Sequence, residues 1–121
     1  MNTITQLFQP YTITQLQLFF IGLSVLIIVG ELPLAMNLVK PNHLYGFRVP
    51  KTLSDERIWY LANSYCGKGL VLTGVITIVC AVVLRLTAMP PATYHLICGL
   101  VILGGVVLTS ITTLIYVWRV Q

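Results

Sequence analysis

Three long runs of apolar residues dominate the pattern along the chain. They cover residues 16–38, 69–86 and 94–118. Each run is close to the roughly 20 residues that a helix needs to cross about 30 Å of hydrocarbon. The runs also lack the strict alternation of apolar and polar positions that a β-barrel strand requires. We therefore predict an all-α integral membrane protein with three transmembrane helices.

A polar connection, residues 39–68, separates the first two runs. Pro50 disfavours a helical conformation at the residue before it, so we expect a new helix to begin just after it. We predict Thr52 as the N-cap of that helix, with Asp55 and Glu56 placing negative charge at its positive end. Apolar residues then recur at helical spacing: Ile58, Leu61, Ala62 and Tyr65. This pattern indicates an interfacial amphipathic helix between the first and second transmembrane helices.

The N-terminal segment, residues 1–15, contains no Lys or Arg. A signal peptide would begin with a basic region, so we expect the first apolar run to be retained. Thr12 and Gln15 have the spacing of a capping box. They predict that the first helix starts near Ile13.

Charge is scarce and unevenly placed. The chain is 57% hydrophobic and 8% charged, whereas about a quarter of the residues of soluble proteins are charged. Five of the seven basic residues lie in the first connection, namely Lys40, Arg48, Lys51, Arg57 and Lys68. Because Lys and Arg are retained on the cytoplasmic side, we expect this loop and the C-terminus inside and the N-terminus outside a bacterial cytoplasmic membrane. The net charge of +4 then indicates contact with membrane lipids and no binding of nucleic acid.

Small residues recur every four positions along the second and third runs. They are Gly69, Thr73, Thr77 and Ala81 on one helix, and Gly105, Thr109 and Thr113 on the other. Such faces let helices approach closely, where dispersion and hydroxyl-to-carbonyl hydrogen bonds hold them together. Either the two faces meet each other or one of them meets a partner. Because three helices bury little surface by themselves, we expect a membrane-protein partner through a small-residue face.

Two charged residues are candidates for binding. The guanidinium of Arg48 either satisfies carbonyls of its own loop, pairs with Asp55, Glu56 or Glu31, or binds a head group or a partner's carboxylate. Glu31 lies near the end of the first run. It is either a functional carboxylate inside the membrane or a side chain at the level of the head groups.

Aromatic side chains and histidines offer further candidates. Trp59 and Tyr60 could stack on a ligand, although an interfacial anchor is the commoner role of such residues. His43 and His95 could ligate haem or a pigment magnesium, but neither has a second histidine at a matching spacing. The sequence does not decide whether either histidine touches such a group.

No catalytic or metal-binding constellation can be assembled from the sequence. The cysteines Cys66, Cys80 and Cys98 include no C-x-x-C pair, which argues against a zinc or redox site. The sequence also lacks a nucleophile with an adjacent base, a phosphate-binding glycine loop and clustered carboxylates. We therefore expect no catalytic residues, no metal and no cofactor, and predict that the protein is not an enzyme.

One composite motif runs through the polar connection. It reads Pro33, then Asn42-x-x-x-Gly46-Phe47-Arg48-x-Pro50-x-Thr52-Leu53, then Trp59-x-x-x-Asn63-x-x-x-Gly67. This pattern resembles the SdpI family of bacterial membrane proteins over roughly residues 30–85. The family's namesake is an immunity protein against a secreted killing factor and is a longer chain with more spans, whereas the motif occurs here once.

The resemblance implies a binding function. The candidate site residues are Asn42, Gly46, Arg48, Pro50, Thr52, Trp59, Asn63 and Glu31. One interpretation is an SdpI-like membrane protein that binds a peptide toxin or relays its presence. The other is an accessory structural subunit of a larger membrane complex, such as a respiratory or photosynthetic assembly. Native sizing after gentle extraction distinguishes the two.

The asymmetry of basic residues predicts the orientation of the chain. In a variant without the native cysteines, a cysteine at Ser54 should resist a membrane-impermeant thiol reagent in intact cells, because it lies inside. A cysteine at Thr5 should react with the same reagent. The reversed labelling pattern would overturn the orientation with the N-terminus outside.

Overall fold

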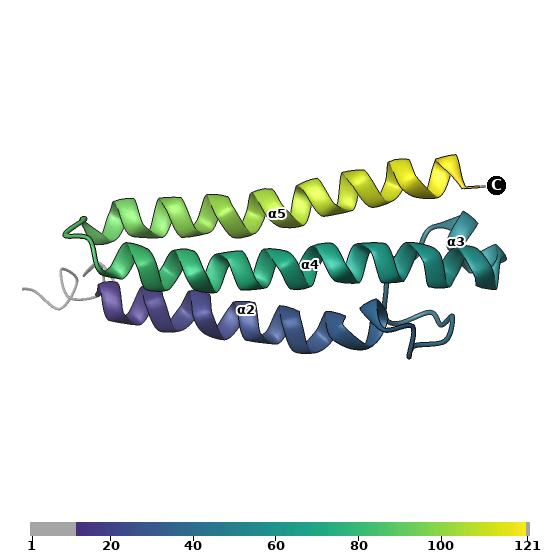
Figure 1. Cartoon of the computed structure of the whole chain (residues 1–121), viewed down its shortest axis with the longest axis horizontal. Coiled ribbons are helices and arrows are strands. Elements are labelled where there is room, and N and C mark those ends of the chain that lie inside the picture. The colour runs from purple at the N-terminus through teal and green to yellow at the C-terminus, as the bar shows by residue number, and fades with distance from the viewer. Residues whose placement is uncertain (1–11, 121) are drawn as a thin grey trace, which may run out of the picture.

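The computed structural model describes residues 12–120 as three long helices and one short helix (Figure 1). In the labels of Figure 1 they are α2 (Ile13–Ala35), α3 (Pro50–Ser54), α4 (Glu56–Arg85) and α5 (Pro91–Arg119). Helix α4 lies between α2 and α5 and packs against both. The three long helices are apolar and long enough to cross a membrane. The predicted all-α fold, with a short helix between the first two long ones, is confirmed.

The start of α2 follows from its capping residues. The Thr12 hydroxyl accepts a hydrogen bond from the Gln15 N–H at 3.2 Å, and the Gln15 side chain accepts one from the Thr12 N–H at 2.9 Å. Two N–H groups at the helix start are thereby satisfied. The predicted capping box and the helix start at Ile13 are confirmed. Most of the predicted N-terminal segment lies outside the described residues.

The end of α2 is set by Asn37. This residue adopts a left-handed conformation with φ of 60°, which Asn tolerates better than most residues with a side chain. The N–H groups of Asn37 and Leu38 then turn back and donate to the carbonyls of Leu34 and Pro33. This is the Schellman arrangement, in which a left-handed residue satisfies the last carbonyls of a helix. Helix α2 therefore ends at Ala35, before the predicted end at residue 38.

The predicted N-cap at Thr52 is wrong. Helix α3 begins at Pro50, where the missing N–H breaks no hydrogen bond because the first turn of a helix does not use it. Thr52 therefore lies inside α3. The N-cap of α4 is Asp55, whose carboxylate accepts hydrogen bonds from the N–H groups of Arg57 at 2.9 Å and Ile58 at 3.4 Å. An acid suits this end of a helix, because the helix dipole is positive there.

The amphipathic stretch of the connection runs directly into the second long helix. Helix α4 continues without a break through its 30 residues, from Glu56 to Arg85. At 1.5 Å per residue it is about 45 Å long, whereas the hydrocarbon layer is about 30 Å thick. The amphipathic stretch is therefore the first part of a helix that extends beyond the hydrocarbon.

Glycines bring α4 against α2. A Cβ atom added to Gly67 would lie 2.7 Å from the Ala35 nitrogen and 3.0 Å from the Glu31 carbonyl oxygen. A Cβ atom on Gly74 would lie 2.7 Å from the Ile28 side chain. The two glycines are seven residues apart and so lie on one face of α4. A larger residue does not fit at position 67, because the atoms that its Cβ would meet belong to the backbone of α2.

Glycine also sets the contact between α4 and α5. Gly69 of α4 faces Thr109 of α5, and Gly105 of α5 faces Thr73 of α4. The small-residue faces of the two helices therefore meet each other, and their remaining members, Thr77, Ala81 and Thr113, are fully buried. Of the two alternatives for these faces, the structure therefore shows the first, in which the faces cover each other.

The threonines of these faces act through their methyl groups. The hydroxyls of Thr73, Thr77 and Thr113 donate to carbonyls four residues earlier in their own helices, at 2.9, 2.8 and 2.6 Å. These three threonines therefore form bonds within their own helices, as threonine commonly does in helices, whereas the Tyr94 hydroxyl of α5 donates to the Ala81 carbonyl of α4 at 2.8 Å. The methyl groups of Thr73 and Thr109 lie nearest to the opposing glycines.

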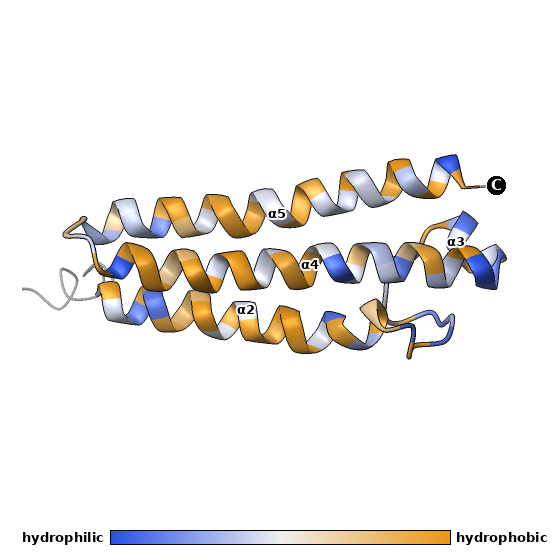
Figure 2. Cartoon of the chain, in the orientation of Figure 1, coloured by the Kyte–Doolittle hydropathy of each residue, from blue (hydrophilic) through white to orange (hydrophobic). Residues whose placement is uncertain are grey.

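The outer surface of the three helices is apolar. Large aliphatic side chains such as Leu18, Leu26 and Leu103 are 67%, 71% and 62% exposed. Figure 2 shows hydrophobic residues along the middle of the long helices and hydrophilic ones concentrated toward the two ends. This distribution suits helices surrounded by lipid, which satisfy their own backbone hydrogen bonds.

The close contact at Gly67 can be tested with one methyl group. We expect Gly67→Ala to lower the free energy of unfolding by about 1–3 kcal/mol, because the added Cβ would meet the backbone of α2. Gly99→Ala is the matched control, because a Cβ there meets nothing within 4 Å and alanine favours the helix. Unfolding in detergent measures both variants. Equal stability of the two would contradict the importance of the close approach.

Candidate functional site

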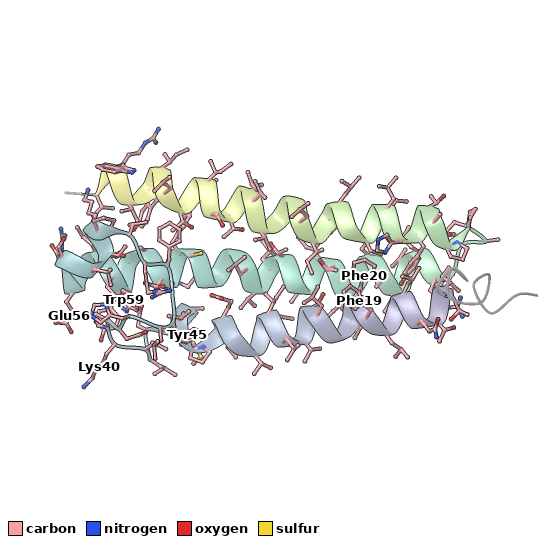
Figure 3. All side chains as sticks on the ribbon, turned by 180° about the vertical axis from the view of Figure 1, so that it is seen from behind. Phe19, Phe20, Lys40, Tyr45, Glu56 and Trp59 are labelled. Atoms are coloured by element: carbon pink, nitrogen blue, oxygen red, sulfur yellow. The ribbon has the colours of Figure 1, made fainter. Side chains whose placement is uncertain are left out.

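The connection between α2 and α3 folds back over the start of α4. Trp59 of α4 is fully buried beneath it, and its indole N–H donates to the carbonyl of Val39 at 2.9 Å. Figure 3 shows Trp59 and Tyr45 at the same end of the molecule as Lys40 and Glu56, opposite Phe19 and Phe20. Trp59 is therefore neither an exposed interfacial anchor nor a free stacking surface. It supports the loop from below.

Asn63 lies one turn further along α4 and holds the middle of the loop. Its side-chain oxygen accepts the N–H of Phe47 at 2.6 Å, and its amide group donates to the carbonyl of Trp59 at 3.0 Å. Gly46 has φ of 119°, and a Cβ atom there would lie 2.7 Å from the Asn63 oxygen and 2.9 Å from the Trp59 ring. Glycine is required at this position because both the backbone conformation and the space exclude a side chain.

Thr52 connects the loop with α3. Its buried hydroxyl accepts the N–H of Val49 at 2.9 Å and donates to the carbonyl of Phe47 at 3.0 Å. Pro50 starts the helix on which Thr52 lies. The Phe47 backbone thus has its N–H bound by Asn63 and its carbonyl bound by Thr52.

Asn42 shapes the first half of the loop. Its side-chain oxygen accepts the N–H groups of Leu44 at 2.9 Å and Tyr45 at 2.7 Å, and its amide group donates to the carbonyl of Lys40 at 2.9 Å. These bonds to nearby backbone are typical of Asn in turns. The partners of Asn42 are all local, whereas Asn63 of α4 also accepts the N–H of Phe47 from the loop, sixteen residues away.

Arg48 also bonds within the loop. Its guanidinium donates to the carbonyl of His43, and its side chain is exposed. Of the carboxylates expected to pair with it, Asp55 accepts N–H groups at the start of α4. Among the described residues Arg48 therefore bonds to a carbonyl and not to a carboxylate.

Glu31 lies four residues before the end of α2 and is partly buried. Its backbone carbonyl is part of the close contact with Gly67. Burial raises the pKa of the Tyr45 phenol above its usual value, and the negative charge of Glu31 raises it further. The carboxylate of Glu31 is therefore close enough to the loop to influence it electrostatically.

Lys51 is a residue of this region that the sequence did not single out. Its ammonium donates to the carbonyls of Val117 at 2.7 Å and Val120 at 2.6 Å, and lies 5.8 Å from the ring centroid of Trp118. A cation is favourable here because the helix dipole is negative at the C-terminus of α5. The partners are more than sixty residues away, so no local pattern could have revealed them.

The two histidines lie at opposite ends of the bundle. His43 is exposed in the loop, whereas His95 is on α5 with its ring 5.7 Å from that of Phe20. Across residues 12–120, no group of three or more His, Cys, Asp or Glu side chains is arranged to hold a metal. Cys66, Cys80 and Cys98 are free thiols.

Because Asn63 and Asn42 form different hydrogen bonds, the same substitution should affect stability differently at the two positions. Asn63→Asp removes the buried donor to Trp59 and places a carboxylate there, so we expect a loss of stability of about 1–3 kcal/mol or more. Asn42→Asp loses a single donor at a solvent-accessible turn and should stay within about 0.5 kcal/mol of the parent. Thermal unfolding in detergent checks both. Similar losses would show that the buried amide group of Asn63 contributes no more to stability than the exposed one of Asn42.

Two known proteins of Bacillus subtilis are similar in sequence to this chain. The chain is 41% identical over 56 residues to the protein named Immunity protein SdpI of Bacillus subtilis (strain 168), which covers 46% of this chain and 26% of that protein. It is 32% identical over 56 residues to the uncharacterized protein YfhL of the same organism, covering 46% of this chain and 51% of YfhL. The chain thus spans about a quarter and about half of the length of these relatives. No solved structure matches.

A family model matches a longer stretch. It is described as the SdpI/YfhL protein family and matches residues 38–117, which include the loop, α3, α4 and most of α5. With three candidate membrane spans, the matched region and α2 together form a multi-pass membrane protein. The chain belongs to the SdpI/YfhL protein family.

Proposed function

We propose that this protein acts by binding, as an immunity or signalling protein of the bacterial cytoplasmic membrane, and not by catalysis. The observation that carries the proposal is the fixed loop on α4. Its motif residues resemble those of the family whose namesake is an immunity protein, and the identity to that relative is 41% over 56 residues. The proposed ligand is a peptide toxin that enters the membrane and reaches its cytoplasmic side, where the loop is expected to lie.

The motif residues support the loop from inside. Trp59, Asn63 and Thr52 are buried, and each bonds to loop backbone. Gly46 leaves the space that the Trp59 ring and the Asn63 side chain occupy. These residues are therefore proposed to position the loop, and a ligand would contact their exposed neighbours.

The exposed neighbours offer a compact mixed surface. Leu44 is 91% exposed, and His43 and Arg48 are exposed beside it. Because the N–H of Leu44 is held by Asn42 and the His43 carbonyl by Arg48, the loop backbone is ordered before a ligand arrives. A preorganised surface binds more tightly, since less conformational freedom is lost on association. An aliphatic side chain beside a cation suits a peptide with apolar and acidic groups.

A second candidate function is that of an accessory subunit in a larger membrane complex. It is favoured by Gly22 and Gly30 of α2 and by Gly99 and Gly104 of α5, where an added Cβ would meet nothing within 4 Å. Helices of another protein could approach closely at such positions. Native sizing after gentle detergent extraction separates the two functions. A large assembly of fixed stoichiometry supports the subunit, and a chain that runs alone or with a bound peptide supports the immunity protein.

Protection of cells tests the proposed function. In Bacillus subtilis cells that lack their own SdpI protein and are exposed to the toxic peptide, we expect this chain to restore survival. We expect Leu44→Ser to weaken protection about tenfold, which corresponds to about 1.4 kcal/mol of binding energy. Leu86→Ser is the control, because Leu86 is 84% exposed in the connection at the other end of α4.

Membrane levels of all variants are measured by immunoblot so that survival is compared at equal amounts. Failure of the parent chain to protect at the level of the native SdpI protein would contradict the immunity role. Loss of protection by Leu86→Ser as well would contradict the role of the loop. The accessory-subunit function would then be tested by native sizing alone.

A further inference from the structure

A pocket of about 370 Å³, lined by both polar and apolar groups, lies on the outer face of α4 at the loop end of the bundle. Asn37, just beyond α2, bounds it on one side, and Tyr116 of α5 bounds it on the other. Tyr60, Tyr65 and Lys68 of α4 lie between them. None of the residues that line the pocket is acidic. The pocket lies apart from the motif side chains that hold the loop.

The groups in this pocket are free to bind a ligand. Within the part of the chain that the structure describes, the Lys68 ammonium makes no hydrogen bond or ion pair, and neither do the hydroxyls of the three tyrosines. The rings of Tyr65 and Tyr116 stack with their centroids 4.7 Å apart and their planes at 13°, which gives the pocket a firm wall. One cation with several hydroxyl donors around it suits a phosphate oxyanion.

The depth of the pocket indicates where its ligand comes from. From Lys68 to Arg85, the last residue of α4, the helix rises about 26 Å, which is close to the roughly 30 Å thickness of the hydrocarbon layer. Lys68 and Arg85 therefore reach the two opposite boundaries of that layer, with the pocket at the boundary on the loop side. Tyrosine is enriched at this level of membrane proteins. A phosphate at this depth belongs to a lipid.

Exposed apolar side chains follow the pocket along the same face of α4. Leu72, Ile76 and Val79 follow Lys68 at steps of three and four residues, and are 58%, 49% and 54% exposed. Ile76 and Val79 line a second hollow of about 330 Å³, whose other lining residues are also on α4 and apolar. A cation and hydroxyls beside a row of exposed apolar side chains suit a phospholipid, whereas a free phosphate would use the cation and the hydroxyls alone.

We propose that this face of α4 binds one anionic phospholipid, with its phosphate at Lys68 and an acyl chain along Leu72, Ile76 and Val79. The phosphate receives hydrogen bonds from the ammonium and from the tyrosine hydroxyls. A zwitterionic lipid is disfavoured because the pocket offers no carboxylate for its quaternary ammonium group. The site is independent of the proposed toxin binding, because it uses none of the loop residues.

Native mass spectrometry of the purified full chain tests the site. With phosphatidylglycerol we expect one lipid to remain bound, and with phosphatidylcholine of the same acyl chains we expect none. Lys68→Gln should lower the affinity for phosphatidylglycerol about fivefold, the usual contribution of one lysine near an anionic membrane. Lys40→Gln removes the same charge from an exposed loop position and should bind like the parent. Lys68→Arg should retain binding.

One more variant and two comparison ligands complete the test of the lipid site. If Lys68→Gln cannot be purified, Tyr116→Phe is used in its place. This variant keeps the aromatic stack and removes one hydroxyl. Weaker retention of phosphatidylglycerol by Tyr116→Phe then supports the pocket. Equal binding by Lys68→Gln and Lys40→Gln would overturn the proposal. So would equal retention of phosphatidylcholine. Inorganic phosphate that displaces the lipid at the same concentration would show that the site recognises free phosphate instead.

Discussion

The close approach of α4 to both of its neighbours is the contact on which the structure depends. In a bilayer the lipid tails are as apolar as leucine, so helices associate through packing and not through exclusion of water. Dispersion falls off steeply with distance, and glycine therefore matters most where backbones meet. Gly67 allows the end of α2 to touch α4, and Gly69 and Gly105 receive the threonine methyl groups between α4 and α5. A bundle with α4 in the middle follows from these contacts.

The geometry of the loop is a consequence of that packing. Because Gly67 brings α4 against Ala35, whose carbonyl accepts the Ser64 hydroxyl at 3.0 Å, the chain leaving α2 has to turn back over the first turns of α4. Backbone groups covered in this way need partners, since an unpaired buried N–H or carbonyl is costly. Trp59 and Asn63 provide those partners from below. The residues shared with the family pattern are thus mainly the internal supports of a loop.

This division of roles bears on the proposed function. If the motif residues hold the loop, they define a scaffold that different members of a family can share. The choice of ligand then belongs to the exposed side chains that the scaffold presents, such as His43 and Leu44. Lys51 extends the scaffold to the third long helix, because its bonds to the end of α5 place that terminus beside the loop. The loop and the end of α5 therefore share one side of the membrane.

The sequence by itself predicted the features that depend on residues close together along the chain. The three apolar runs predicted the long helices, and Thr12 with Gln15 predicted where α2 starts, because hydrophobic length and capping are local properties. Contacts between distant segments were decided by the tertiary structure. The burial of Trp59, the partners of Lys51 and the meeting of the small-residue faces all require knowing which helices become neighbours. The role of Thr52 was misjudged for a local reason, because α3 already begins at Pro50 and the Thr52 hydroxyl bonds to the backbone of Val49 and Phe47 from inside that helix.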